Sequence, residues 1–333
     1  MSAPPKAKYV RQHRIFGADA RVAFLYLIPA FAVMAIITFY PLLYQVWMSF
    51  TDFQEQNLRS GSAAPPWVGL GNYIQILTNN VAGLPNYDFL RILAFNLFWA
   101  FSNVIIHVCL GVAIAMLLNQ RGLIGRAIYR AIFVLPVVIP PIIVATVWRN
   151  MFDTNNGAIN YLIAIITRQP PGNVQIAWLT DPGNPIWFFP LLPLSYFALL
   201  TANVWLGWPL NTVVATGALQ SIPNDLYEAV EIDGGGAWTK FRFITLPFLR
   251  PAMLPFAIYG FVITFNLFYL SYFMSAGGPF GRTELLVTEA YRMVNEQHLY
   301  GVAAAFSVIM FFILLALTII TNRFTKATAS YVD

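Results

Sequence analysis

Six long stretches of this sequence contain no aspartate, glutamate, lysine or arginine, and they restrict the possible folds more than any other feature. They cover residues 22–51, 92–120, 131–148, 182–224, 251–281 and 297–322. A helix that crosses a bilayer needs about 20 predominantly apolar residues, so each stretch can supply one spanning helix. We therefore predict an all-α integral membrane protein with about six transmembrane helices.

The composition agrees with a chain that is covered mostly by lipid. Only 10% of the 333 residues are charged and 58% are hydrophobic, whereas soluble domains carry about 25% charged residues. The net charge of +5 is spread between the apolar runs and forms no basic patch with interleaved aromatic residues. We interpret these cations as topology signals and expect no nucleic-acid partner.

The predicted organisation is one transmembrane domain over residues 21–325, between tails at 1–20 and 326–333. Its spans are expected at about 22–50, 92–118, 131–152, 190–216, 251–272 and 299–322. If the N-terminus is inside, 13 of the 19 lysines and arginines fall in cytoplasmic segments. The positive-inside rule then predicts that both tails are cytoplasmic.

The sequence offers little chemistry of its own inside the membrane. His13, His107 and His298 fall in a tail, a span and an outer interface, which predicts no metal site and no catalytic residue. We interpret His107 as a packing histidine. No carboxylate lies inside a span, whereas carriers driven by protons or sodium use an ionisable group or a broken helix near the midplane. An energy source outside this chain is therefore expected.

A glycine-rich segment at 234–241 does not fit a phosphate-binding loop. That loop needs glycine directly before its lysine and serine or threonine directly after it, whereas Thr239 and Phe241 flank Lys240. If ATP drives this protein, another chain hydrolyses it. The chain itself is expected not to be an enzyme.

The predicted cytoplasmic loop between the fourth and fifth spans is the most informative segment. Residues 221–250 can form two short helices on either side of Gly234, Gly235 and Gly236, since glycine commonly ends a helix. The first helix carries apolar and acidic side chains together. A projecting pair of this kind is suited to enter a groove on a partner protein.

This loop closely resembles the E-A-A…D-G…I-x-L-P coupling loop of binding-protein-dependent ABC importer permeases. The matching residues are Glu228, Ala229, Asp233, Gly234, Ile244, Leu246 and Pro247, and Val230 stands where the family usually has alanine. The stretches 69-GLGNY-73, 135-LP-136, 206-LGWP-209 and 277-GGP-279 are similar to the carbohydrate branch of that family, which includes maltose-type and glycerol-phosphate-type permeases.

The resemblance implies the type I ABC importer permease fold in the cytoplasmic membrane of a prokaryote. It implies that the loop docks in a cleft of a cytoplasmic ATPase dimer, which would bind the ATP and magnesium, with no cofactor in this chain. It also implies a second permease, expected to be related but not identical, and an extracytoplasmic solute-binding protein.

Polar residues on two spans mark a candidate substrate pathway. Asn203, Gly207 and Asn211 share one helix face, but small and amide residues also join helices in membranes, so the pattern alone leaves both readings open. The resemblance favours a pathway, because maltose-type permeases contact sugar from the same two helices. The matching positions are Asn203, Leu206, Gly207, Leu210, Gly260, Ile263, Thr264 and Leu267.

These features predict a permease subunit that moves a sugar or oligosaccharide delivered by a binding protein. An importer of a glycerophosphate-type or other polar solute is an alternative, but a transported phosphate favours arginine or lysine facing the pore, and none lies within the six uncharged stretches. An integral membrane enzyme is a further alternative. It would need clustered histidine or carboxylate residues, which the sequence lacks.

Overall fold

The computed structural model describes residues 18–84, 87–120, 122–181, 183 and 192–325. Most of the two predicted tails, and the start of the predicted fourth span, lie outside these residues. The described chain is helical apart from its loops and one isolated bridge between Thr51 and Trp67, which confirms the all-α prediction.

The first half of the chain contains α1 (Ala18–Met34), the π-helical turn η1 (Ala35–Phe39), α2 (Tyr40–Met48), the 3-10 turn η2 (Glu55–Leu58), α3 (Gly71–Leu77), α4 (Phe89–Leu118), α5 (Arg126–Val138), α6 (Pro141–Met151) and α7 (Ala158–Ile166). The second half contains α8 (Leu194–Gln220), α9 (Asn224–Ile232), α10 (Ala237–Lys240), the π-helical turn η3 (Phe241–Thr245), α11 (Leu246–Phe265), α12 (Phe268–Ser275), α13 (Leu286–Asn295) and α14 (Tyr300–Thr325).

Five helical segments of the described chain are long and apolar enough to cross a membrane. They are Val22–Met48, Phe89–Leu118, Leu194–Gln220, Ala237–Ser275 and Tyr300–Arg323. A sixth crossing results if α5 and α6 act together, although the two helices are bent by 95°. This number agrees with the prediction of about six transmembrane helices.

The third span, predicted at about 131–152, consists of two helices in the structure. Ile139 has an extended backbone (φ −81, ψ 128), and α6 begins at Pro141 after Pro140. Proline lacks the backbone N–H that would continue a helix, and it disfavours helical geometry in the residue before it. The two consecutive prolines therefore divide the segment into α5 and α6.

The fifth span also differs from the expected 251–272. It begins earlier, since η3 runs directly into α11, and the helix is interrupted at Asn266 and Leu267. The Asn266 side chain donates a hydrogen bond to the Val262 carbonyl at 3.0 Å. An asparagine that bonds its own helix in this way offers the backbone an alternative to the regular helical ladder. The chain resumes as α12.

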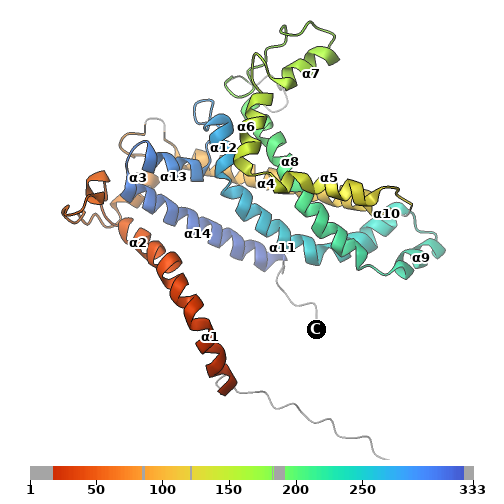
Figure 1. Cartoon of the computed structure of the whole chain (residues 1–333), viewed down its shortest axis with the longest axis horizontal. Helices are drawn as coiled ribbons and strands as arrows, with labels where there is room; N and C mark the ends of the chain where they lie inside the picture. The colour runs from red at the N-terminus through yellow and green to blue at the C-terminus, as the bar shows by residue number, and fades with distance from the viewer. Residues whose placement is uncertain (1–17, 85–86, 121, 182, 184–191, 326–333) are drawn as a thin grey trace, which may run out of the picture.

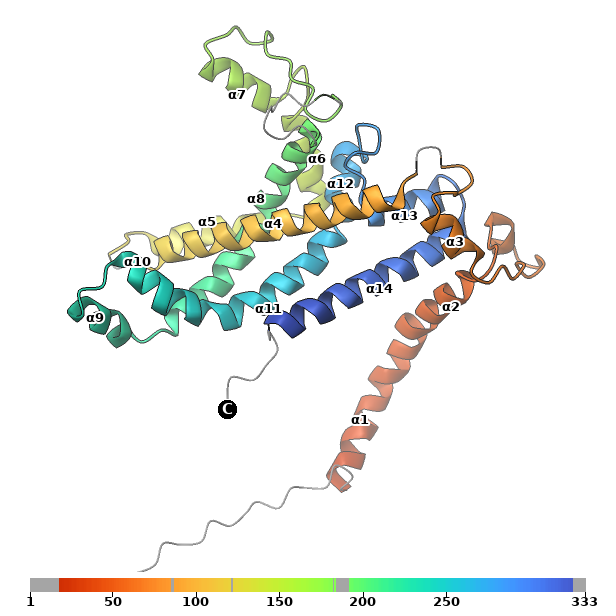
Figure 2. The same cartoon turned by 180° about the vertical axis from the view of Figure 1, so that it is seen from behind.

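The helices α4, α8, α11 and α14 gather in one bundle, while α1 diverges from it (Figures 1 and 2). The bundle core is held by contacts of α4 with α8 and α11, and α14 contacts α2, α3 and α13. The helices α9 and α10 lie at one end of the bundle, and α3 and α13 lie at the other.

Two apolar clusters inside the bundle position the candidate sites. The middle cluster joins α4, α6, α8 and α12 around Trp99 and Leu270, and the partly buried Leu206 and Leu267 pack against it. The inner cluster joins the last turns of α4 and α8 to the segment η3–α11. The first cluster therefore lies beside the predicted substrate residues, and the second lies beneath the predicted coupling loop.

Candidate functional site

The predicted coupling loop is a pair of short helices joined by a tight glycine turn. α9 ends at Ile232, and Gly234 follows in the left-handed region with φ +76. The Gly235 N–H donates to the Val230 carbonyl at 2.8 Å, and the Gly234 N–H donates to the Glu231 carbonyl at 3.0 Å. This pair of bonds defines a Schellman motif, in which glycine is favoured at the left-handed position.

The loop has an inner face and an outer face. Tyr227 and Val230 pack against the inner cluster, and the Tyr227 hydroxyl lies 3.0 Å from the Thr245 hydroxyl. Val230, the departure from the family motif, therefore directs its larger side chain towards the bundle. Ile244 is buried in the same cluster, and Leu246 is half-buried.

The outer face combines charged and large apolar side chains. Glu228, Ala229, Asp233 and Pro247 are exposed. Ile232 and Trp238 are also exposed, at 86% and 73%, and an ion pair between Glu231 and Lys240 joins α9 to the following helix. An apolar surface of this kind at the end of a bundle is typical of a protein–protein contact.

The structure brings six residues of α4 and α8 into one polar seam. The seam pairs Asn103 with Asn203, His107 with Gly207, and Gly111 with Asn211, so the two helices run parallel and in register. Within each helix these residues lie one turn apart and share a face. Small residues and amides at such a crossing allow close approach and hydrogen bonding between membrane helices.

Direct contacts define the centre of the seam. The Asn203 side-chain amide donates to Asn103 Oδ1 at 2.7 Å, and His107 Nε2 lies 3.0 Å from the Asn203 carbonyl. Because a carbonyl can only accept, Nε2 carries the imidazole proton. A Cβ on Gly207 would overlap the His107 ring. His107 therefore fills the space that glycine leaves, as expected of a packing histidine.

This arrangement buries three of the predicted pathway residues between helices of this chain. Asn203 and Thr264 are each only 4% exposed, and Gly207 faces the His107 ring. The polar stripe of α8 points towards α4, as the helix-packing alternative expects. The sequence shows which residues share a helix face, but it does not show which neighbouring helix covers that face.

The other predicted pathway residues lie at or near the surface of the chain. Leu210 and Ile263 are 44% and 50% exposed, and a Cβ on Gly260 would meet open space. Leu206 and Leu267 are half-buried at the middle cluster. The open faces of α8 and α11 are therefore lined by apolar residues more than by amides.

An ion pair buried near α13 was not anticipated from the sequence. Glu284, only 2% exposed, lies 3.1 Å from Arg292 Nη1, and Arg292 also donates to the Ala276 carbonyl. Burial raises the pKa of Glu284 to about 7, and Arg292 opposes part of that rise. Burial also raises the pKa of Glu289. Glu284 precedes the start of α13 and Arg292 lies within it. This spacing matches no sequence pattern that would predict an ion pair.

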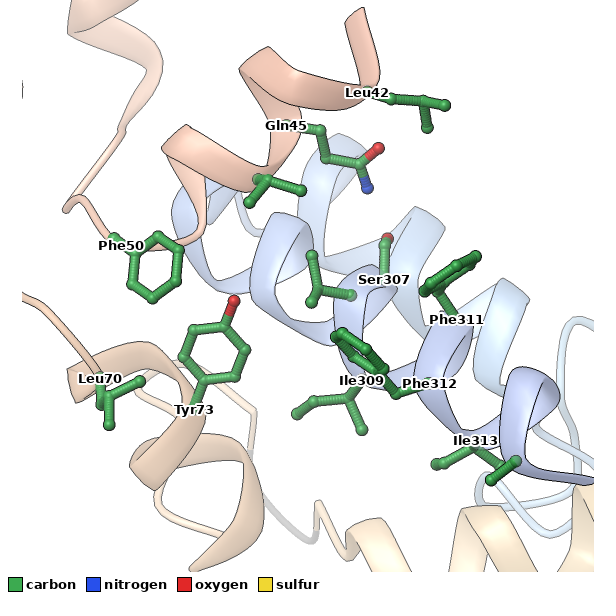
Figure 3. A pocket seen from close by; sticks show the side chains of 13 residues that line it. Leu42, Gln45, Phe50, Leu70, Tyr73, Ser307, Ile309, Phe311, Phe312 and Ile313 are labelled. Carbon is green, nitrogen blue, oxygen red and sulfur yellow. The ribbon is translucent and has the colours of Figure 1, made fainter. Parts of the chain in front are cut away.

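A large apolar groove lies between α2 and α14 (Figure 3). Its volume is about 840 Å³, and the polar side chains around it are those of Gln45, Tyr73 and Ser307. Its apolar lining is typical of a surface that lipid or another helix covers.

No group of three or more histidine, cysteine, aspartate or glutamate side chains within the described ranges could hold a metal ion.

Comparisons with known proteins agree on one class. Residues 107–330 match the family described as binding-protein-dependent transport system inner membrane component. The maltodextrin transport system permease protein MalC of Streptococcus pneumoniae is 32% identical over 312 residues, which cover 90% of this chain and 68% of that protein. The trehalose/maltose transport system permease protein MalF of Thermococcus litoralis is 30% identical, and the match covers 91% of this chain and 92% of that protein.

A galactooligosaccharides transport system permease protein, GanP of Bacillus subtilis, is 29% identical over 90% of this chain and 69% of its own length. Among solved structures, a chain of a bacterial ABC transporter involved in alginate import superimposes with a TM-score of 0.70 at 18% identity. The match covers 94% of this chain and 97% of that one, and it establishes the similarity of the folds.

Proposed function

The chain belongs to the family of binding-protein-dependent transport system inner membrane components, and from this membership we propose that it is the permease subunit of an ATP-driven importer of a sugar or oligosaccharide. The observation that carries the proposal is the family match over residues 107–330, joined by oligosaccharide permeases that are 29–32% identical over nine-tenths of the chain. The resemblance found in the sequence is thereby confirmed, and the protein is a multi-pass membrane permease.

We infer that this subunit is not catalytic and that a partner ATPase dimer binds and hydrolyses ATP with magnesium. No cofactor or metal is assigned to the chain itself. The glycine-rich turn at Gly234 supports the assignment of ATP hydrolysis to another chain. The turn ends a helix through a Schellman motif and lacks the residue spacing of a phosphate-binding loop.

The surface proposed for ATPase docking is the outer face of α9 and α10. It comprises Glu228, Ala229, Asp233, Gly234, Leu246 and Pro247 of the family motif, together with the exposed Ile232 and Trp238. This proposal is supported by the inner face of the loop, which packs against the inner cluster and so leaves the outer face free for a partner. The proposed orientation places this loop and both termini in the cytoplasm, as the distribution of lysine and arginine predicts.

The proposed sugar pathway follows the open faces of α8 and α11. Leu206, Leu210, Gly260, Ile263 and Leu267 would face the sugar, whereas Asn203, Gly207 and Thr264 hold the helices. The absence of aspartate, glutamate, lysine and arginine throughout α8 favours a neutral sugar over a phosphorylated solute, which would need a cationic partner.

The remaining partners are proposed from the family. A second permease, related but not identical, would complete the channel, and an extracytoplasmic binding protein would deliver the sugar. The exposed apolar helix α1 and the groove between α2 and α14 offer surfaces for that permease or for membrane lipid.

The test is ATP-dependent uptake of radiolabelled maltotriose into vesicles that contain this chain with its genetic neighbours, namely a second permease, an ATPase and a binding protein. Uptake should require ATP and the binding protein, and glycerol 3-phosphate should not compete. Competition by glycerol 3-phosphate, without uptake of any neutral sugar, would support the alternative solute class.

A further inference from the structure

A second cavity lies on the outer side of the middle cluster, away from the coupling loop. It is formed by the last turn of α6, the loop that follows, and α12, and its volume is about 440 Å³. This size is within the range of sites for small molecules. Under the proposed orientation it opens towards the extracytoplasmic space.

The lining of this cavity is unusual for a chain with so few charges. Arg149, Asn150 and Asp153 line it, together with the aromatic residues Tyr272 and Phe273. The Arg149 guanidinium makes no hydrogen bond or ion pair with another residue in the described ranges. Planar donors and aromatic rings in one cavity suit a hexose, whose hydroxyls need donors and acceptors and whose ring has an apolar face.

The loop that contributes Asp153 and Thr154 to the lining is held in place by hydrogen bonds. Asn160 donates to the carbonyls of Thr154 at 2.9 Å and Ile176 at 3.0 Å, and it accepts from Trp178 Nε1 at 2.8 Å. Backbone N–H groups of Asn156 and Asn155 bind Asp153 Oδ1 and lower the pKa of its carboxyl. This loop is therefore preorganised, which reduces the entropic cost of binding a ligand.

The cavity adjoins the proposed pathway through shared residues. Phe152 and Met274 line the cavity and also belong to the middle cluster. The same cluster contacts Leu206 and Leu267, which are expected to face the sugar. A sugar in the cavity would thus lie against one side of the cluster, with the pathway on another side.

We propose that this cavity is a reception site that binds one neutral hexose unit before the sugar enters the pathway along α8 and α11. Arg149 and Asn150 bind hydroxyl groups of the hexose, and Tyr272 and Phe273 cover its apolar face. This inference rests on the proposed function as a sugar importer and adds a second binding site to it.

The test measures binding of maltotriose to the complete transporter in lipid nanodiscs, without the binding protein, by saturation-transfer difference NMR. Arg149→Gln should weaken binding by about tenfold, as expected for the loss of a hydrogen bond to a charged group. Asn150→Ala should weaken it less. Arg168→Gln provides the matched control, because Arg168 is an exposed arginine of the same loop region that does not line the cavity.

Uptake with saturating binding protein is measured on the same variants. If maltotriose is taken up but Arg149→Gln and Asn150→Ala bind it as tightly as Arg168→Gln does, the reception site is wrong and the proposed function stands. Uptake without detectable binding to the unmodified complex would overturn the reception site in the same way. If the unmodified complex takes up no neutral sugar, the proposed function itself fails. Should Arg149→Gln fail to assemble, Asn150→Ala decides alone.

Discussion

The polar seam and the proposed coupling loop both depend on glycine, but for opposite physical reasons. Gly207 is covered by the His107 ring, so its position requires the absence of a side chain. Gly234 has open space around it and φ +76, so its position requires backbone freedom. One glycine therefore permits close approach of two helices, whereas the other permits a turn. Substitutions that separate volume from conformation can test this difference.

The largest effect is expected for Gly207→Ala. Its added methyl group would overlap the His107 imidazole and force α4 and α8 apart, and overpacking of this kind costs about 1–3 kcal/mol. We expect loss of assembled complex and of uptake, measured by size-exclusion chromatography and transport assays. His107→Ala in the same chain should restore assembly in part, because it removes the overlapping ring.

Gly217→Ala is the matched control. Gly217 lies on the same helix as Gly207, but a Cβ there would meet no atom within 4 Å. In a helix, alanine is favoured over glycine by about 1 kcal/mol, so this variant should assemble normally. A double variant with no better assembly than Gly207→Ala alone would contradict the overlap explanation.

Gly234→Val should have the next largest effect. A β-branched residue with φ > 0 is strained by about 1–3 kcal/mol, although no neighbouring atom blocks the side chain. The membrane helices should insert normally, while sugar-stimulated ATP hydrolysis and uptake are lost.

Gly236→Val is the control, because it introduces the same side chain into the same turn at a residue with φ −80 and open space. It shows whether the backbone conformation of Gly234, and not the mere presence of valine in the turn, matters. It should retain stimulated hydrolysis, measured with purified complexes in lipid. Normal stimulation and uptake in Gly234→Val would show that this turn is not the coupling element.

Asn203→Leu tests whether Asn203 holds the helices together or faces the sugar. The variant leaves the buried Asn103 Oδ1 without its donor, which costs about 1–3 kcal/mol, so thermal stability and assembly should decline. Ile263→Ala, at an exposed position, should instead change uptake with little loss of stability. If Asn203→Leu lowers uptake and leaves thermal stability unchanged, Asn203 faces the sugar after all.

The smallest effect concerns Glu284. Its folded-state pKa of about 7 lies above the ordinary value of 4.5, so the folded protein binds a proton that the unfolded chain releases between these values. The stabilisation is complete below about pH 4.5 and is lost as the pH rises through 7. Glu284→Gln should therefore flatten the fall in Tm over that pH range, as measured by differential scanning fluorimetry. An unchanged slope would exclude Glu284 as the source.

The sequence predicted the number and composition of the helices because the bilayer demands long apolar segments. It did not predict the division at Pro140 and Pro141 as a sharp bend, because prolines within apolar runs can also kink a continuous helix. The pairing of α4 with α8 along the seam could not be predicted from the sequence. Asn103 and Asn203 are 100 residues apart, and helical spacing does not identify the partner helix. The pair of Glu284 and Arg292 was missed because its two members lie close in sequence at a spacing that follows no recognised pattern.

The in-register seam limits how α4 and α8 can move relative to each other. Sliding α8 by one turn would bring the His107 imidazole opposite Asn203 or Asn211, where a side chain occupies the space that Gly207 leaves open. The two helices must therefore be displaced together, as one stiff unit. A short turn at 221–223 joins α8 to α9, so we expect a tilt of the proposed coupling loop to move α4 and α8 together.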